Sequence, residues 1–315
     1  MLPESKLSST AALVDSVMGQ YTGVGHLLKD HLTTDICRGS FTRHLGTFLP
    51  IMAEELHSAM AEKFQFEGKW DNAKQEEPSV MKLFVESGKD KGPESITARL
   101  MILTGAALHT SSMAIAHAVY DLCSMPEYIE PLRLEAQTAL AQEKGEWSLS
   151  ALKRLHRLDS FLKESQRVNH SSFLGFNRKI MSSIRLSDGT ILPRGTVVAA
   201  PGGPMSRDPK FYDEPQRFDG LRFYRADDSR DVSSARTQDY VGIEPGNLSW
   251  GNGRFTCPGR WYAAVMIKLI LAKLLLEFDV SFPAGQTERP LNGKYDTDVH
   301  PDFDQKIVLR KRPTV

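Results

Sequence analysis

One cysteine stands between a glycine-rich turn and a long apolar run, and this arrangement constrains the chain more than any other feature. Cys257 lies within Trp250–Arg260, which reads W-G-N-G-R-F-T-C-P-G-R, and the apolar run Val265–Leu276 follows it. The length and composition of that run predict a core helix. Amide groups and the positive dipole at a helix start stabilise a negatively charged sulfur. The pattern therefore favours a thiolate at this position.

The cysteine count and the neighbouring glycines support that interpretation. The chain has 3 cysteines in 315 residues, too few and too scattered for a disulfide framework. Gly251, Gly253 and Gly259 let the backbone bend tightly and approach a flat ligand closely. A thiolate held in this way is what an iron porphyrin needs as its fifth ligand. The alternative is a buried structural cysteine at the start of a helix.

The stretch resembles the cysteine-ligand loop of the cytochromes P-450, written F-x-x-G-x-x-x-C-x-G. Trp250 stands for the aromatic residue, and the continuation C-P-G-R-W-Y-A is similar to the fungal branch. The resemblance implies haem b (iron protoporphyrin IX), with Cys257 as the axial metal ligand. It further implies that the cofactor is bound by loop residues and two arginines, namely Trp250, Gly251, Gly253, Gly259, Arg178 and Arg254.

The two arginines are expected to hold the carboxylates of the haem. Arg178 lies at about the offset after Arg167 where relatives place such an arginine. The usual basic residue of the family two places before the cysteine is Phe255 here, and Arg254 is the candidate that replaces it. An ordinary solvated arginine is the alternative for each of them.

The composition describes a globular chain without a dominant charge. Hydrophobic residues make up 41% and charged residues 25%, while Lys+Arg and Asp+Glu both number 39. No net field favours nucleic acid or an anionic membrane, and the few cysteines suit a reducing compartment. The N-terminus shows no apolar run that could span a bilayer, whereas relatives sit on the endoplasmic reticulum through such a helix. We therefore expect a cytoplasmic-facing location.

The periodicity predicts helices first and short strands later. A long helix is expected over 94–125, opened by Pro93 and ended before Pro126, with two or three more helices over 126–170. An Asp188-Gly189 turn in 184–191 predicts a hairpin. After it we expect a meander over 201–249, a helix behind Cys257 and strand-like pieces over 279–311.

These elements are mainly α with small β-sheets, and the resemblance implies an incomplete cytochrome P-450 fold. We expect a single haem-thiolate domain over 1–315, with early helices in 1–70, a shortened connector in 71–93 and the haem-binding core in 94–315. Compared with relatives, the chain is expected to lack the N-terminal anchor and first strands. It is also expected to lack several helices that roof the substrate pocket.

A structural triad is expected below the cysteine loop. Glu164 and Arg167 form an E-x-x-R pattern, and residues three apart share one face of a helix. Taken alone, this is a common surface ion pair. Pro215–Phe218 resembles the P-x-R-F motif of the family, which implies that Glu164 bridges Arg167 and Arg217.

The long helix carries the residues expected to deliver protons. Thr110 matches the family threonine in the pattern (A/G)-G-x-(D/E)-T, and a hydroxyl both donates and accepts hydrogen bonds. Ala107 and His109 replace the usual glycine and acid, as in fungal members. His109 is a candidate proton relay, since its unperturbed pKa is near 6.5, or a helix histidine satisfied by a neighbour.

The resemblance implies an oxidoreductase that inserts one oxygen atom of O2 into a small apolar substrate, in fungal secondary metabolism. Terpenoids, alkaloids and polyketides are the expected classes. Electrons would come from NADPH through a cytochrome P-450 reductase, with cytochrome b5 as a second donor, because the chain shows no dinucleotide motif. Two alternatives stay open: a non-catalytic remnant of such an enzyme, and a haem-thiolate isomerase or dehydratase.

Overall fold

The computed structural model describes residues 93–224 and 239–313, together with Phe84 and Ser87. The chain divides into two units, Met1–Ala106 and Ala107–Val315, and the boundary falls within helix α5 (Pro93–Ser124). The expected early helices and nearly all of the expected connector lie outside the described residues. The second unit contains every other element named below.

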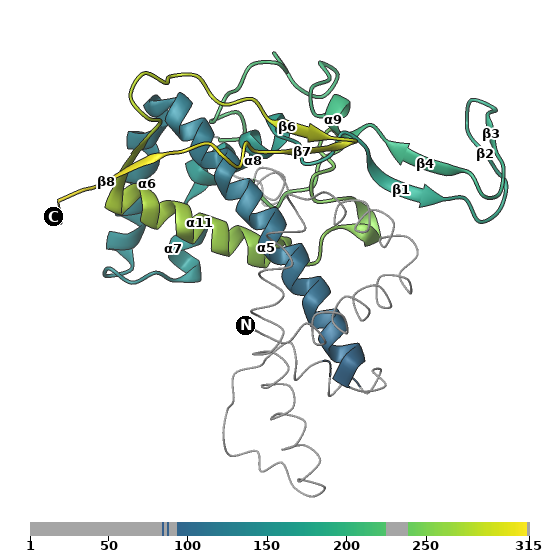
Figure 1. Cartoon of the computed structure of the whole chain (residues 1–315), viewed down its shortest axis with the longest axis horizontal. Coiled ribbons are helices and arrows are strands. Elements are labelled where there is room, and N and C mark those ends of the chain that lie inside the picture. Colours follow the sequence, from purple (N-terminus) through teal and green to yellow (C-terminus); the bar gives the residue numbers. More distant parts are fainter. Residues whose placement is uncertain (1–83, 85–86, 88–92, 225–238, 314–315) are drawn as a thin grey trace, which may run out of the picture. The chain divides into compact units, whose positions relative to one another are not determined.

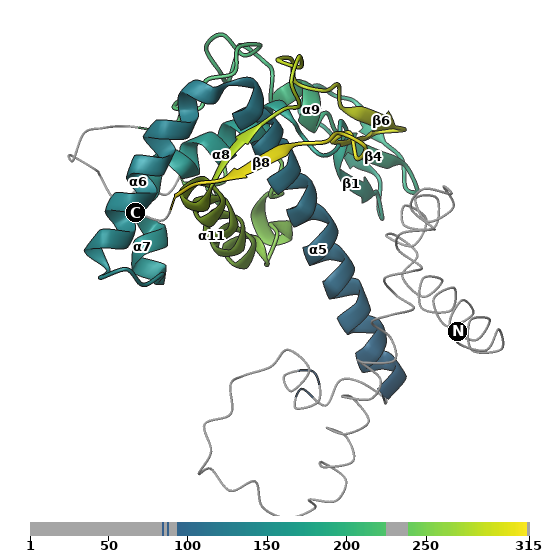
Figure 2. The ribbon, with the colours of Figure 1, turned by 60° about the vertical axis from the view of Figure 1, so that its left-hand side comes forward.

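Helices make up most of this unit, as predicted. After α5 come η1 (Pro126–Tyr128), α6 (Ile129–Gln142), α7 (Leu149–Lys153), α8 (His156–Val168), α9 (Gly202–Met205), η2 (Gly253–Phe255) and α11 (Arg260–Glu277). The predicted helix over 94–125 and the helix behind Cys257 are both present, as α5 and α11. Helices α6, α7 and α11 lie together in two views of the molecule (Figures 1 and 2).

The described strands form small antiparallel sheets of two strands each. The pairs are β1 (Gly175–Lys179) with β4 (Val197–Ala200), β2 (Ile184–Arg185) with β3 (Ile191–Leu192), β5 (Phe278–Ser281) with β8 (Val308–Lys311), and β6 (Gly293–Tyr295) with β7 (Asp298–His300). The β2–β3 hairpin turns at Gly189, whose φ is +89°, as the Asp-Gly pair predicts. The fold class is therefore mainly α with small β-sheets.

The core lies where the second half of α5 meets α6, α8 and α11. Leu122, Leu132, Phe161 and Leu271 are almost completely buried there. Each such side chain contributes about 1.5–3 kcal/mol when it leaves water. Helix α8, which carries Glu164, and helix α11, which follows Cys257, therefore pack into one continuous apolar cluster.

A buried arginine fixes the far end of α11. The Nε of Arg133 on α6 donates to the carbonyl of Leu275 at 2.7 Å, and its Nη2 donates to the Asp279 carboxylate at 2.8 Å. Carbonyls in the last turn of a helix lack partners within that helix, and a cation suits the negative end of its dipole. Arg133 thus holds the helix whose other end follows Cys257.

Helix α5 is long and apolar enough to cross a membrane by length and composition alone, a test that core helices of soluble proteins also pass. Ile102–Ser124 has a mean hydropathy of 1.2, and 22% of that window is buried. Its second half, however, packs into the core through Ala118 and Leu122 and carries the ionisable Asp121. These contacts are those of a core helix.

Asp121 ties α5 to α8 and to the C-terminal segment. Its carboxylate accepts bonds from Ser165 Oγ at 2.6 Å, Asn169 Nδ2 at 3.1 Å and Arg289 Nε at 2.5 Å. Burial raises the pKa of Asp121, while the neighbouring Arg289 opposes that shift. Arg289 also donates to Nδ1 of the buried His117 at 2.8 Å. A single buried network therefore positions the last two turns of α5.

Candidate functional site

The cysteine loop closes on itself just before α11. The amide of Cys257 donates to the carbonyl of Trp250 at 2.7 Å, and this hydrogen bond closes the loop formed by the residues between them. The indole N–H of Trp250 donates to the carbonyl of Tyr240 at 2.8 Å, and the centres of the two rings lie 5.3 Å apart. Arg260, the first residue of α11, donates to the carbonyl of Cys257 at 2.9 Å. The half-buried thiol therefore stands on a loop held at both ends.

Gly251 is the glycine on which the loop geometry depends most directly. Its φ is +77°, and a Cβ added there would lie 2.8 Å from the carbonyl oxygen of Phe255. Gly253 also has a positive φ, +58°, but an added Cβ would meet nothing within 4 Å. At Gly259 the nearest atom to an added Cβ is the sulfur of Cys257, at 4.0 Å. Of these three glycines, Gly259 is therefore the one whose missing side chain leaves space next to the thiol.

Two arginines converge on one aromatic ring of this loop. The guanidinium carbon of Arg178, on β1, lies 4.0 Å from the ring centre of Phe255, and that of Arg254 lies 4.7 Å away. Arg178 also stacks on Phe176 at 4.2 Å. The structure thus brings the two expected arginines together beside the cysteine loop.

Glu164 is the centre of a fully buried charge network. Its two oxygens accept from Arg167 at 2.7 and 2.8 Å, and both side chains have no exposed surface. The same guanidinium also donates to backbone: Nη1 to the carbonyls of Ser206 and Pro215, and Nη2 to that of Arg217. The E-x-x-R pair is therefore not the common surface ion pair.

The third member of the triad is Arg222, and the expectation of Arg217 is wrong. The Nε of Arg222 reaches the two oxygens of Glu164 at 3.2 and 3.1 Å. The guanidinium of Arg217 instead pairs with the exposed Glu214, and its own side chain is 68% exposed. Arg217 takes part only through its carbonyl, which accepts from both Arg167 and Arg222.

The sequence contained a signal for the correct arginine. The dipeptide Arg-Phe occurs twice in the meander, at Arg217-Phe218 and at Arg222-Phe223. Pro215 favoured the first, because it completes the P-x-R-F pattern. The structure uses the second because the amide of Asp219 caps Glu164 at 2.8 Å, which turns the chain so that Arg222 points inward.

Further ion pairs fasten the meander to the helices. Lys163 on α8 pairs with Glu244 at 3.2 Å, and Tyr212 donates to the same carboxylate at 2.6 Å. Lys268 on α11 pairs with Asp159 on α8 at 2.7 Å. Burial raises the pKa of Asp159 to about 6, and Lys268 opposes this shift. Ion pairs therefore join α8 to the meander and to α11, the helix that follows the cysteine loop.

Thr110 and His109 lie on an exposed stretch of α5. Both side chains are exposed, as are those of Ala107 and Leu108, while the next residue, Ser111, is buried. The expected roles of Thr110 and His109 in proton delivery remain predictions.

The residues around Cys257 fit an iron porphyrin. The donor set is one thiol, with Gly259 beside it, and two guanidiniums, and such a set suits an iron porphyrin that carries carboxylates. Among the described residues no carboxylate lies within ion-pair distance of Arg178 or Arg254. Both cations therefore have in-plane donors to offer to an acidic group.

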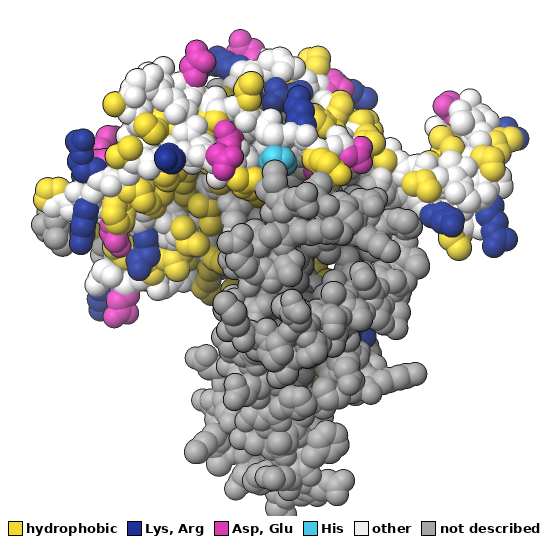
Figure 3. Space-filling model, in the orientation of Figure 1, with side chains coloured by type: hydrophobic (Ala, Val, Ile, Leu, Met, Phe, Trp, Pro, Cys, Tyr) yellow, Lys and Arg dark blue, Asp and Glu magenta, His cyan; other side chains and the backbone are white. Residues whose placement is uncertain are grey.

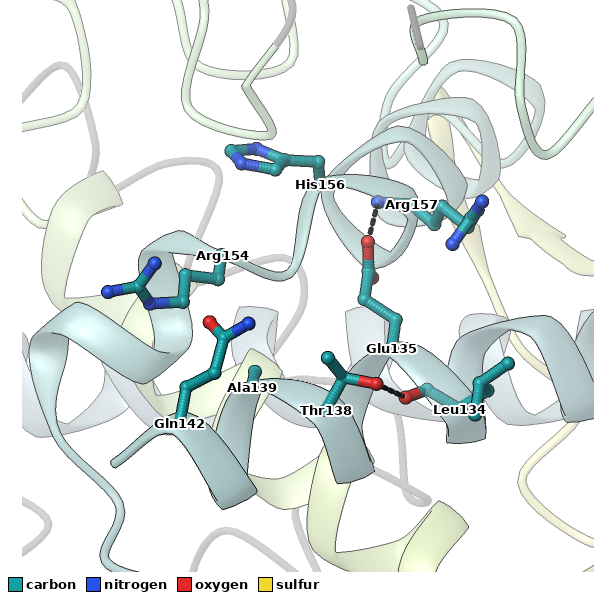
Figure 4. A pocket seen from close by; sticks show the side chains of 8 residues that line it. All are labelled: Leu134, Glu135, Thr138, Ala139, Gln142, Arg154, His156 and Arg157. Atoms are coloured by element: carbon teal, nitrogen blue, oxygen red, sulfur yellow. Dashed lines mark hydrogen bonds between the residues drawn. The ribbon is translucent and has the colours of Figure 1, made fainter. Parts of the chain in front are cut away.

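Two other features of the described residues do not form part of this site. A shallow groove of about 330 Å³ lies between α6 and the start of α8 (Figure 4), and there the Glu135 carboxylate accepts from the amide of Arg157 at 2.8 Å. Nearby, the side-chain nitrogen or oxygen atoms of His156, Asp159 and Asp239 that could bind a metal ion lie within 4.8 Å of one another. The ammonium of Lys268 already balances Asp159. Neither feature includes a residue of the cysteine loop.

The described surface mixes both signs of charge. On the face in Figure 3, acidic and basic side chains alternate with hydrophobic ones. This mixture agrees with the equal numbers of acidic and basic residues in the chain, 39 of each.

Comparison with known proteins identifies the family. The family model for cytochrome P450 matches residues 39–302. Similar proteins include the cytochrome P450 monooxygenase olcJ of Penicillium canescens, 39% identical over 72% of this chain and 42% of its own length. Ent-kaurene oxidase of Gibberella intermedia is 42% identical over 72% of this chain and 43% of its own length. The cytochrome P450 monooxygenase paxP of Penicillium paxilli is 37% identical over 73% of this chain and 43% of its own length.

The chain therefore spans less than half the length of these curated relatives. The family match nevertheless covers the cysteine loop, the E-x-x-R helix and the meander, which are the parts whose geometry is described above. This chain belongs to the cytochrome P450 family.

Proposed function

We propose that this chain forms the haem-binding part of a monooxygenase that oxidises a small apolar compound in fungal secondary metabolism. The observation that carries the proposal is Cys257 on a closed loop ahead of α11, with Arg178 and Arg254 beside it. When bound, a thiolate-ligated haem supplies oxygen activation, because the thiolate donates electron density that favours O–O cleavage. The names of two relatives support monooxygenation, and that of a third, an ent-kaurene oxidase, supports an apolar, terpenoid-like substrate.

In this proposal each residue of the chain has a separate task. The sulfur of Cys257 binds the metal, and the guanidiniums of Arg178 and Arg254 hold the carboxylates of the cofactor. The hydroxyl of Thr110 would pass protons to oxygen bound at the haem, with His109 as a relay. Glu164 and its two arginines keep the meander in place and touch no substrate. Electrons would arrive from NADPH through a separate reductase.

Haem reconstitution tests the proposal. The full chain is expressed with haem supplied, reduced and exposed to carbon monoxide, and the Soret band is recorded. A thiolate-type band supports the proposal. A band typical of imidazole or neutral thiol, or no band, would instead indicate a non-catalytic remnant.

Turnover then separates oxygenation from rearrangement. NADPH consumption with a purified fungal reductase is expected for a monooxygenase and not for an isomerase or dehydratase. The Thr110→Ala variant should keep the thiolate-type band and release more peroxide for each NADPH consumed, because proton delivery is impaired. Unchanged coupling of NADPH to product would remove Thr110 from the mechanism.

A further inference from the structure

Phe255 occupies a position where a basic residue is expected, and it contacts two basic residues. Phe255 is 53% exposed. The guanidinium carbons of Arg178 and Arg254 lie 4.0 and 4.7 Å from the centre of its ring. Both distances are within the range of cation–π attraction. The ring therefore gathers the two cations from β1 and from the cysteine loop.

The strand that carries Arg178 is bent to make this contact. Gly175 pairs with Ala200 but Arg178 pairs with Val198, so β1 contains one extra residue. Bulges of this kind redirect a side chain towards a neighbouring element. Phe176 within the bulge has a φ of +62°, an uncommon conformation for a bulky residue. Backbone strain is thus accepted at the point where Phe176 and Arg178 meet the loop.

The result is a guanidinium held between two rings. Arg178 lies 4.2 Å from the centre of Phe176 and 4.0 Å from that of Phe255, whose rings are 6.5 Å apart at 88°. Because the two rings are nearly perpendicular, the planar guanidinium can lie flat against at most one of them. One of its N–H groups donates to the carbonyl of Asn177 at 2.7 Å. Two rings and one carbonyl thus hold this cation, with no acidic partner from the described residues.

We propose that Phe255 is a positioning residue that holds Arg178 and Arg254 for the carboxylates of the bound porphyrin. The inference rests on the proposed function. An aromatic ring here replaces the single cation of the family pattern by two cations gathered from neighbouring positions. Two guanidiniums around one ring repel each other, and a pair of carboxylates relieves that repulsion.

A comparison of haem with its dimethyl ester tests this role. Esterification removes the negative charges and leaves the iron and the ring system intact. Affinities of the full chain for both forms are measured by quenching of tryptophan fluorescence. The parent chain should prefer haem. Phe255→Leu should reduce that preference by about tenfold, because the ring that gathers the two cations beside the loop is lost.

Three variants make the result specific. Phe255→Tyr keeps a ring and should retain the parent preference. Phe303→Leu is the matched control, because its ring is 55% exposed and stacks on His300 instead. Arg178→Gln combined with Phe255→Leu should weaken the preference by less than the product of the two single effects, because Phe255 acts through Arg178.

The outcomes distinguish this inference from the proposed function. If the parent binds haem through Cys257 but prefers neither form, or if Phe255→Leu matches the parent, the positioning role is wrong and the haem-thiolate proposal stands. An equal loss in Phe303→Leu also overturns the positioning role. If the parent binds neither form, both proposals fail.

Discussion

Glu164 and Cys257 are surrounded in opposite ways. The carboxylate of Glu164 is completely buried and accepts from two arginines and one amide. The cysteine loop is closed by the bond from the Cys257 amide to the Trp250 carbonyl, and Arg254 and Phe255 within it are exposed. The difference indicates that the triad stabilises the fold, whereas the loop presents groups to a ligand. Substitutions should separate these two properties.

The largest effect is expected at the triad. Glu164→Gln leaves Arg167 and Arg222 without their shared charge in a buried place, which should lower the free energy of unfolding by about 3–5 kcal/mol. Urea denaturation followed by circular dichroism measures this. Arg217→Gln is the matched control, since its pair with Glu214 is exposed, and it should change stability by no more than about 0.5 kcal/mol. If Arg217→Gln and Arg222→Gln lowered the free energy of unfolding equally, the assignment of Arg222 to the triad would be contradicted.

The next largest effect is a loss of stability at acidic pH. Burial, followed by the charge of Arg289, lowers the pKa of His117 from 6.5 to about 3. The unfolded chain therefore binds a proton near pH 6.5 that the folded chain does not, so stability is lost as pH falls from about 6.5 towards 3. Between pH 7 and pH 4 the loss from this group should be about 2–3 kcal/mol.

His117→Gln isolates that contribution. Glutamine can still accept from Arg289 but does not titrate, so the variant should lose less stability between pH 7 and pH 4 than the parent. Asp121 contributes with the opposite sign, because burial raises its pKa, and this contribution is common to both proteins. Urea midpoints at the two pH values give the difference. Identical pH dependence in parent and variant would show that His117 is not the group responsible.

A smaller effect is expected within the loop. Gly251→Ala forces a side chain into a positive φ and places a Cβ 2.8 Å from the carbonyl oxygen of Phe255. It should cost about 1–2 kcal/mol and distort the loop enough to weaken haem binding. Gly253→Ala meets the φ penalty alone, because nothing lies within 4 Å of the added Cβ. A greater loss of stability and haem affinity in Gly253→Ala would contradict this account of the loop.

The smallest effect on stability should accompany the largest effect on the spectrum. Cys257→Ala removes one half-buried sulfur and should leave the free energy of unfolding within about 0.5 kcal/mol, yet abolish the thiolate-type Soret band. Cys123→Ala is the control, because Cys123 is also half-buried and burial raises the pKa of its thiol to about 11. It should keep the band. A band retained in Cys257→Ala would disprove the ligand assignment.

Features that depend on neighbouring residues in the sequence were predictable, and those that depend on distant contacts were not. The apolar residues of α5 and α11 predict these helices from the local sequence alone, and the Asp188-Gly189 pair predicts its turn in the same way. The choice between Arg217 and Arg222 depends on how the meander folds over Glu164, which no local pattern encodes. The Asp121 network likewise joins Ser165 and Arg289, residues far apart in the chain.

The site shows the same division. The cysteine motif is a contiguous run, so Cys257 and its glycines could be found by their order alone. Phe255 was read only as a missing basic residue, because its contacts with Arg178 cross from β1 to the loop. The bulge that creates these contacts leaves no signature in the composition of Gly175–Lys179.

The extra residue in β1 also affects how this edge of the protein can change. Two residues lie between Gly175 and Arg178, whereas only one lies between their partners Ala200 and Val198. Removing Phe176 would therefore give a regular ladder in which Arg178 still faces Val198, but without the positive φ and without one of its two rings. A single-codon deletion in a short ribbon could thus remove backbone strain and loosen one cation without altering the residues that flank the metal ligand.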